Sequence, residues 1–311
     1  MARTRARFFV FLLLFASVLV VVVSRFDLRA MQAAFTNASW DWIAAAALMN
    51  LLGIIVDGVR WKAIVGAVRR ISLASAIEGL LVGWLSSLVL PLKLGEGAKA
   101  WLMARREGLP IATVVSTVLL DRVVDGAALV LFIVLTSIVA PLPASDQNLR
   151  LWAFAALIVI ALGFVVVRRW IRGRRRAEAQ GESVFQRIVD GFAILGQQHR
   201  LGGTVVVAVA AWFTRMGVVW CTMRAFHLML PAVAAASVLV AINIGITAIA
   251  APGNLGVFEL SAITGLALWG VPGETALSFG IGLHALELVP TIILGLLVQT
   301  RTRTLLRGPA V

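Results

Sequence analysis

PLKLGEGAK, at residues Pro91 to Lys99, interrupts a long apolar run that begins near residue 74. APGNLGVFE, at Ala251 to Glu259, interrupts a later apolar run in a similar way. Pro and Gly end helices, and helical character resumes after both interruptions. The two stretches therefore predict two helical hairpins. The residues of the two predicted turns are Pro91, Gly95, Pro252, Gly253 and Gly256.

The composition shows that these hairpins lie in a membrane protein. The chain of 311 residues is 60% hydrophobic and 14% charged, and its mean hydropathy is +0.96. A helix needs about 20 apolar residues to cross a bilayer, and apolar runs of that scale recur from residue 8 to residue 298. The runs are too continuous for alternating barrel strands. We therefore expect an all-α polytopic protein, with a single membrane domain over residues 1–311.

The basic residues predict how the chain crosses the membrane. Arginines precede the run at 8–23, which we expect to stay as an uncleaved first helix, and a cluster from Arg168 to Arg176 follows the run at 151–167. If every run crossed fully, that cluster would lie outside, against the positive-inside rule. A first hairpin that re-enters from the inside removes the conflict, and the second hairpin then enters from the outside. The prediction is about six full crossings, two re-entrant hairpins and cytoplasmic termini in the inner membrane.

The two interrupted runs also align with each other. The turn prolines share an offset of 161 (252−91), and the Gly-x-Pro sequences that follow share an offset of 162 (270−108). We assign repeat 1 to about residues 74–140 and repeat 2 to about 232–298, in opposite orientations; chance alignment of Gly and Pro is the alternative. Paired interrupted segments of an inverted repeat indicate a substrate site near the bilayer midplane.

Ionisable residues inside apolar runs are costly and need a partner or a purpose. The candidate binding or transport residues are Lys93, Glu96, Lys99, Asp121, Arg122, Asp125, Arg215, Asn254, Glu259, His284 and Glu287. In the functional interpretation they line a polar cavity whose cations attract an anionic head group, while the acidic residues balance charge or carry protons. Arg215 meets an acidic residue or a phosphate.

In the structural interpretation, Arg122 and Asp125 form a buried ion pair and Glu96 caps its helix. Asp57 and Arg60, three residues apart, are expected to form a surface pair near the interface.

The segment 168–202 is basic and partly amphipathic. We expect it to lie on the cytoplasmic leaflet and bind anionic lipid, with a regulatory or partner-binding loop as the alternative. Since the other basic residues fall in short loops between apolar runs, no nucleic-acid partner is expected.

Enzyme chemistry is not expected either. The sequence has a single cysteine, three histidines far apart, and no P-loop, Gly-x-Ser-x-Gly or His-Glu-x-x-His motif. We therefore expect no metal, no cofactor and no catalytic residues.

Four motifs in this order resemble the lysylphosphatidylglycerol synthase transmembrane region, or flippase-like domain, family over about residues 8–300. They are RWK at Arg60–Lys62, PLKLGEGAKAW at Pro91–Trp101, DRVVD at Asp121–Asp125 and APGNLGVFE at Ala251–Glu259. The family's Gly-Glu and following basic residue match Gly95, Glu96 and Lys99, and its acidic-Arg pair matches Asp121 and Arg122. Lys93 and Asn254 depart from the family pattern.

The resemblance implies a role with lipids. In bifunctional members this region moves an aminoacylated phospholipid between leaflets, and a separate soluble domain makes that lipid; no such domain is found here, so aminoacylation is not expected. Standalone members handle other lipids. We expect a translocator of a polar-headed, anionic lipid that works by rocking one repeat against the other. The alternatives are an accessory protein that presents lipid to a lipid-modifying or glycosyltransferase enzyme, and an ion or metabolite transporter.

Overall fold

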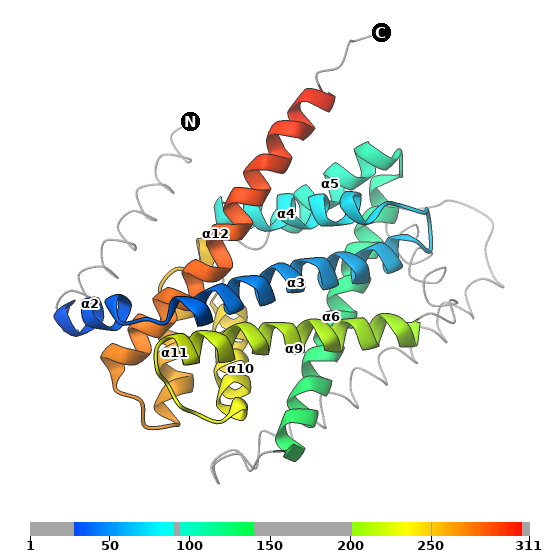
Figure 1. The fold of residues 1–311 in the computed structure, drawn as a ribbon. Coiled ribbons are helices and arrows are strands. Elements are labelled where there is room, and N and C mark those ends of the chain that lie inside the picture. The colour runs from blue at the N-terminus through cyan, green and yellow to red at the C-terminus, as the bar shows by residue number, and fades with distance from the viewer. Residues whose placement is uncertain (1–27, 90–93, 140–200, 250, 307–311) are drawn as a thin grey trace. The chain divides into compact units, whose positions relative to one another are not determined.

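The computed structural model describes residues 28–89, 94–139, 201–249 and 251–306, and these form helices and turns without a strand (Figure 1). The α-helices are α2 (Leu28–Thr36), α3 (Trp40–Val65), α4 (Leu73–Val89), α5 (Gly95–Glu107), α6 (Ile111–Val139), α9 (Leu201–Ala225), α10 (Ala232–Ala248), α11 (Val257–Ala267) and α12 (Gly273–Leu306). A short 3-10 helix, η2 (Pro252–Asn254), precedes α11.

Three of these helices are long and apolar enough to cross a membrane. Their spanning parts are Trp40–Val65, Gly202–Ala225 and Gly273–Thr300, with 26, 24 and 28 residues, against the roughly 20 that a bilayer requires. Helix α6 is also long, with 29 residues, but carries three charged residues near its middle. The prediction of an all-α polytopic membrane protein is confirmed. The predicted spans at 8–23 and 151–167 and most of the basic segment, up to residue 200, lie outside the described residues, and α9 begins at Leu201.

The two predicted hairpins form as helix pairs, in which α4 packs on α5 and α10 packs on α11. Helices α5 and α11 have 13 and 11 residues, which at 1.5 Å per residue gives roughly 20 and 17 Å, too short for a bilayer core of about 30 Å. Acidic Glu96 in the first turn of α5 and basic residues in its last turn complement the helix dipole. Gly108, with φ of 61°, ends α5, and Pro110 then precedes α6.

Both hairpins close through equivalent contacts. A Cβ on Gly83 of α4 would lie 3.0 Å from Lys99 Cβ of α5, and a Cβ on Gly245 of α10 would meet Ser261 of α11. Both members of these pairs are offset by 162 (245−83 and 261−99), as are the first residues of α5 and α11 (257−95). The left-handed glycines that end the hairpins, Gly108 and Gly270, share the same offset. The two hairpins therefore have the same length between these contacts, and the equivalent packing is consistent with the predicted internal repeat. The inverted orientation stays a prediction.

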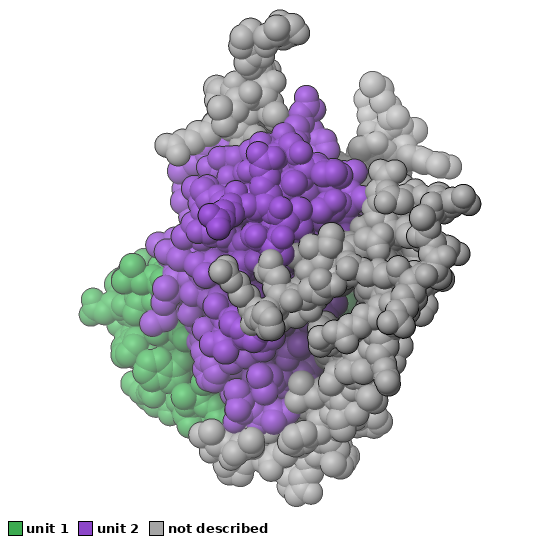
Figure 2. All heavy atoms as spheres, turned by 90° about the vertical axis from the view of Figure 1, so that its right-hand side faces the viewer, with its two compact units in different colours: residues 1–48, 216–288 green, residues 49–215, 289–311 purple. Residues whose placement is uncertain are grey.

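The chain divides into two compact units (Figure 2). Unit 1 comprises residues 1–48 and 216–288 and contains the hairpin α10–α11; unit 2 comprises residues 49–215 and 289–311 and contains the hairpin α4–α5. Helices α3, α9 and α12 contribute residues to both units.

The close packing at the start of α5 predicts a stability effect. Gly95→Ala would push a methyl group against Gly83 O and Ser87, and overpacking of this kind costs about 1–3 kcal/mol. Gly97→Ala is the matched control, because a Cβ on Gly97 meets nothing within 4 Å; removing a helical glycine there gains up to about 1 kcal/mol. Thermal unfolding in detergent measures both. Equal midpoints for the two variants would contradict the close packing of the hairpin.

Candidate functional site

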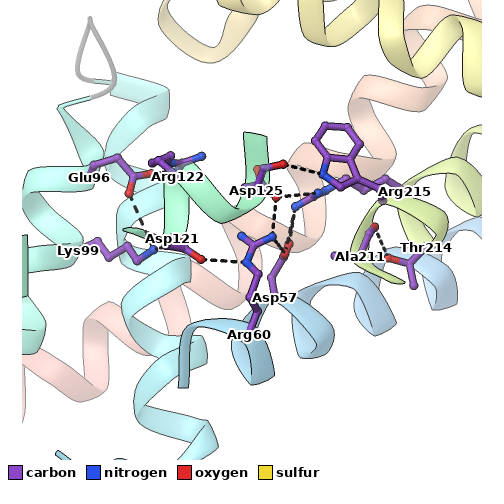
Figure 3. A network of polar contacts seen from close by, with 11 residues as sticks. Asp57, Arg60, Glu96, Lys99, Asp121, Arg122, Asp125, Ala211, Thr214 and Arg215 are labelled. Carbon is purple, nitrogen blue, oxygen red and sulfur yellow. Dashed lines mark hydrogen bonds and ion pairs between the residues drawn. The ribbon is translucent and has the colours of Figure 1, made fainter. Parts of the chain in front are cut away.

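Unit 2 contains a network of charged side chains from four helices (Figure 3). The charged network consists of Asp57 and Arg60 of α3, Glu96 and Lys99 of α5, Asp121, Arg122 and Asp125 of α6, and Arg215 of α9. It holds four carboxylates and four cations, so its formal charge is zero. Leaving one member of a buried ion pair unmatched is strongly unfavourable, and this balance avoids it.

Asp121 is the centre of the charged network. Its Oδ1 accepts a hydrogen bond of 2.9 Å from Arg60 Nε, and its Oδ2 accepts one of 3.0 Å from Lys99 Nζ. The Lys99 ammonium also lies 4.0 Å from the centroid of the Trp61 ring, a cation–π contact. The side chains of Asp121 and Lys99 are 2% and 1% exposed. Lys99 is therefore fully engaged within the protein.

Arg60 and Arg215 connect α3, α6 and α9. Arg60 Nη1 lies 2.5 Å from Asp125 Oδ1 and 3.2 Å from Asp57 Oδ1. Arg215 Nη2 donates to both oxygens of Asp57, at 2.8 and 3.0 Å, and Nη1 lies 3.5 Å from Asp125. The Arg215 guanidinium carbon lies over the Trp212 ring at a distance of 4.7 Å. The indole Nε1–H of Trp212 donates a hydrogen bond to the backbone carbonyl of Asp125.

The expectation of a surface pair for Asp57 and Arg60 was wrong, because both are buried and belong to the charged network. Sequence spacing identified their contact along one helix but not the acidic residues that α6 brings to Arg60. One sequence signal was present: Asp57 lies within an apolar run, and apolar residues resume at Ala63, shortly after Arg60. Arg215 does meet acidic residues, one of its two predicted roles.

Glu96 and Arg122 form the exposed edge of the charged network. Glu96 Oε1 accepts from Arg122 Nη2, and the Arg122 side chain is 47% exposed against 20% for Glu96. Glu96 Oε2 is buried without a hydrogen bond and lies 3.8 Å from Lys99 Nζ. The predicted pairing of Arg122 with Asp125 was wrong, because Arg122 pairs with Glu96 of α5 instead of with its neighbour along α6. The predicted cap was also wrong, since the side chain of Glu96 turns to Arg122 and α5 has no side-chain cap.

Unit 1 contains a polar pair at the other hairpin, formed by Glu259 and His284. Glu259 Oε1 lies 2.7 Å from His284 Nδ1, and Glu259 Oε2 accepts a 2.7 Å hydrogen bond from the Gly256 backbone N–H. The Phe258 ring stacks on the imidazole at 4.2 Å and 10°. Both side chains are largely buried. The pair therefore ties α12 to the first turn of α11.

The turn before α11 accommodates Asn254 for a backbone reason. Asn254 has φ of 56°, next to Gly253 at 60°, and Gly256 follows at 80°. Asn adopts this left-handed region more readily than other non-glycine residues. An asparagine at a position that favours glycine is thus consistent with the turn.

The structure therefore divides the candidate residues between two places. Six lie in the charged network and two form the pair in unit 1, while Glu287 lies one turn beyond His284 on α12. Lys93 and Pro91 lie outside the described residues.

Together, the spanning helices and the neutral charged network define an α-helical, multi-pass membrane protein with a largely buried polar cluster shared by four helices. The chain belongs to the lysylphosphatidylglycerol synthase transmembrane region family, whose model matches residues 8–295. The resemblance seen in the four sequence motifs is thereby confirmed, and a membrane protein with a lipid-related role fits it. No curated protein matches the sequence.

Proposed function

We propose that this protein moves a polar-headed, anionic lipid between the leaflets of the cytoplasmic membrane, with both termini in the cytoplasm and without catalysing a reaction. The observation that carries the proposal is the half-exposed guanidinium of Arg122, at the edge of a largely buried charged network that is neutral as a whole. A charged residue at mid-helix in a membrane protein is costly, and a substrate pathway is a common reason to retain one.

The head group is bound by Arg122 in this proposal. A guanidinium presents several N–H donors in a fixed plane and matches phosphate oxygens well. Lys99 does not take this role, because its ammonium is buried between Asp121 and the Trp61 ring. Its role is to hold Asp121 and to stay close to Glu96.

Glu96 changes partner when the lipid binds. Its Oε1 is paired with Arg122, and its unbonded Oε2 lies 3.8 Å from Lys99 Nζ. When a phosphate replaces Glu96 at Arg122, a small rotation brings the carboxylate to Lys99. The displaced carboxylate then remains paired with a cation, which lowers the free-energy cost of exchanging partners at membrane depth.

Lipid movement in proteoliposomes tests this function. The protein is reconstituted into vesicles with fluorescent phosphatidylglycerol, and dithionite bleaching of the outer leaflet reports the rate of exchange. We expect wild-type protein to move the lipid, and Arg122→Gln and Glu96→Gln each to reduce the rate at least about tenfold, the loss of one charge-assisted contact worth about 1.5–3 kcal/mol.

Arg106→Gln is the matched control, because Arg106 pairs with Glu78 across the same hairpin but outside the charged network. It should keep the wild-type rate, with equal incorporation of all variants measured by gel filtration and vesicle flotation. Wild-type rates for both network variants would remove the head-group site. No movement by wild-type protein would favour the accessory role.

A further inference from the structure

The two hairpins make equivalent polar pairs that differ in chemistry. In the first, Arg122 of α6 pairs with Glu96 in the first turn of α5; in the second, His284 of α12 pairs with Glu259 in the first turn of α11. The two bases are offset by 162 (284−122), the offset of the hairpin contacts, and the two carboxylates by 163 (259−96). In both hairpins, a basic side chain on the following long helix, α6 or α12, thus contacts the first turn of the short helix, α5 or α11.

The substitution of histidine for arginine makes the second pair depend on a proton. An arginine keeps its charge at every physiological pH, whereas an unperturbed imidazole titrates near pH 6.5. With Glu259 ionised, Nδ1–H of His284 donates to Oε1, while Oε2 accepts from Gly256 N–H. The carboxylate is fixed at both oxygens, and Phe258 holds the plane of the ring. Proton exchange is therefore left to Nε2, for which the structure gives no hydrogen-bond partner among the residues it describes.

Few other titratable groups belong to the elements around His284. Phe35 of α2 and Phe226, just after α9, pack beside Gly282 of α12, and Glu259 of α11 lies against Gly280. The titratable residues of these elements within unit 1 are Arg29 of α2, Cys221 and Arg224 of α9, Glu259 of α11, and Glu274 and Glu287 of α12, while α10 has none. Arg224 bonds to Met229 and Leu230 instead. Glu259 is the group in direct contact.

We propose that His284, held by Glu259, is a proton-binding site and that its protonation state sets the rate of lipid movement. Nε2 takes a proton from water through its lone pair, which converts a neutral imidazole bonded to a carboxylate, with a net charge of −1, into an imidazolium–carboxylate ion pair with a net charge of zero, the counterpart of Arg122 with Glu96. Loss of that N–H proton to water restores the neutral imidazole. This inference rests on the proposed function for its effect on lipid, but not for the proton site.

Nuclear magnetic resonance tests the proton site directly. Protein with isotope-labelled histidine is placed in nanodiscs, and the His284 signal is assigned by its loss in His284→Gln. Spectra are recorded from pH 5 to pH 8; we expect the His284 signal to change as Nε2 takes up a proton, and Glu259→Gln to alter that change, because it removes the charged partner. A His284 signal that does not titrate in this range would overturn the site.

The pH profile of lipid movement tests the coupling. His284→Arg fixes the charge and should give a rate that is independent of pH and equal to the low-pH rate of wild-type protein. His284→Gln should give the high-pH rate throughout. The matched control is His227→Gln, since His227 also belongs to unit 1 but bonds to the Asn37 carbonyl; its profile should follow wild type.

The outcomes separate this inference from the proposed function. Profiles of both His284 variants that follow wild type, with His284 titrating, would overturn the coupling and leave lipid movement intact. If wild-type protein moves no lipid at any pH, the proposed function and the coupling fail together, while the magnetic resonance titration still decides the proton site.

Discussion

Asp121→Asn should destabilise the protein by about 3–5 kcal/mol, the usual cost of removing one partner from a buried ionic group. The carboxylate is 2% exposed and holds both Arg60 and Lys99. Asparagine keeps the shape but not the charge, and leaves the charged network with four cations and three carboxylates. Thermal unfolding in detergent should show a large fall in the midpoint.

A double variant controls for the shape of the new side chain. Asp121→Asn with Lys99→Met removes one charge of each sign and restores neutrality, and the methionine can still lie against the Trp61 ring. We expect the double variant to recover most of the lost stability, because a buried ion pair can often be replaced by apolar groups at little cost. If the two substitutions are simply additive, charge balance does not stabilise the charged network.

Exchanging the charges of Glu96 and Arg122 should abolish lipid movement without abolishing folding. Each single reversal, Glu96→Arg or Arg122→Glu, places two like charges together and should lower the unfolding midpoint. The double exchange restores an ion pair and should return stability to within about 1 kcal/mol of wild type, the range for exposed pairs, apart from a small helix-dipole penalty.

Lipid movement should not recover in the double exchange. The half-exposed position on α6 would then carry a carboxylate, which repels a phosphate head group. Proteoliposome rates and unfolding midpoints measured on the same preparations separate the two roles. Recovery of both would mean that the pair acts only in folding.

The fold could be predicted where it depends on local chemistry. The Pro and Gly residues of the two turns placed the hairpins correctly, and the apolar run that begins near residue 74 matches the start of α4, Leu73–Val89. Helix ends differ by a few residues: the second interruption begins at Ala251, whereas α10 ends at Ala248. The positions of helices and turns depend on local composition, which can be read directly from the sequence.

The candidate site could be predicted in its members but not in its pairings. The cost of a charge in an apolar run pointed to Asp121, Arg122 and Asp125. Their partners come from α3, α5 and α9, up to 90 residues away in sequence, and helical spacing reports only neighbours along one helix. For that reason Arg122 was assigned to Asp125 instead of Glu96, and Arg60 to the surface.

The balance of four cations against four carboxylates also has a consequence for how the protein is made. Helix α6 enters the membrane with three charged residues, each costing about 2.5–3.5 kcal/mol on insertion scales, and finds partners already present on α3 and α5. Arg215, however, is translated 90 residues after Asp125 (215−125), which takes roughly 5–18 s at typical synthesis rates. During that interval the part of the charged network already synthesised holds four carboxylates and three cations. Biogenesis therefore passes through a stage with one uncompensated negative charge, in which the insertion machinery or lipid must shield the acidic residues until α9 arrives.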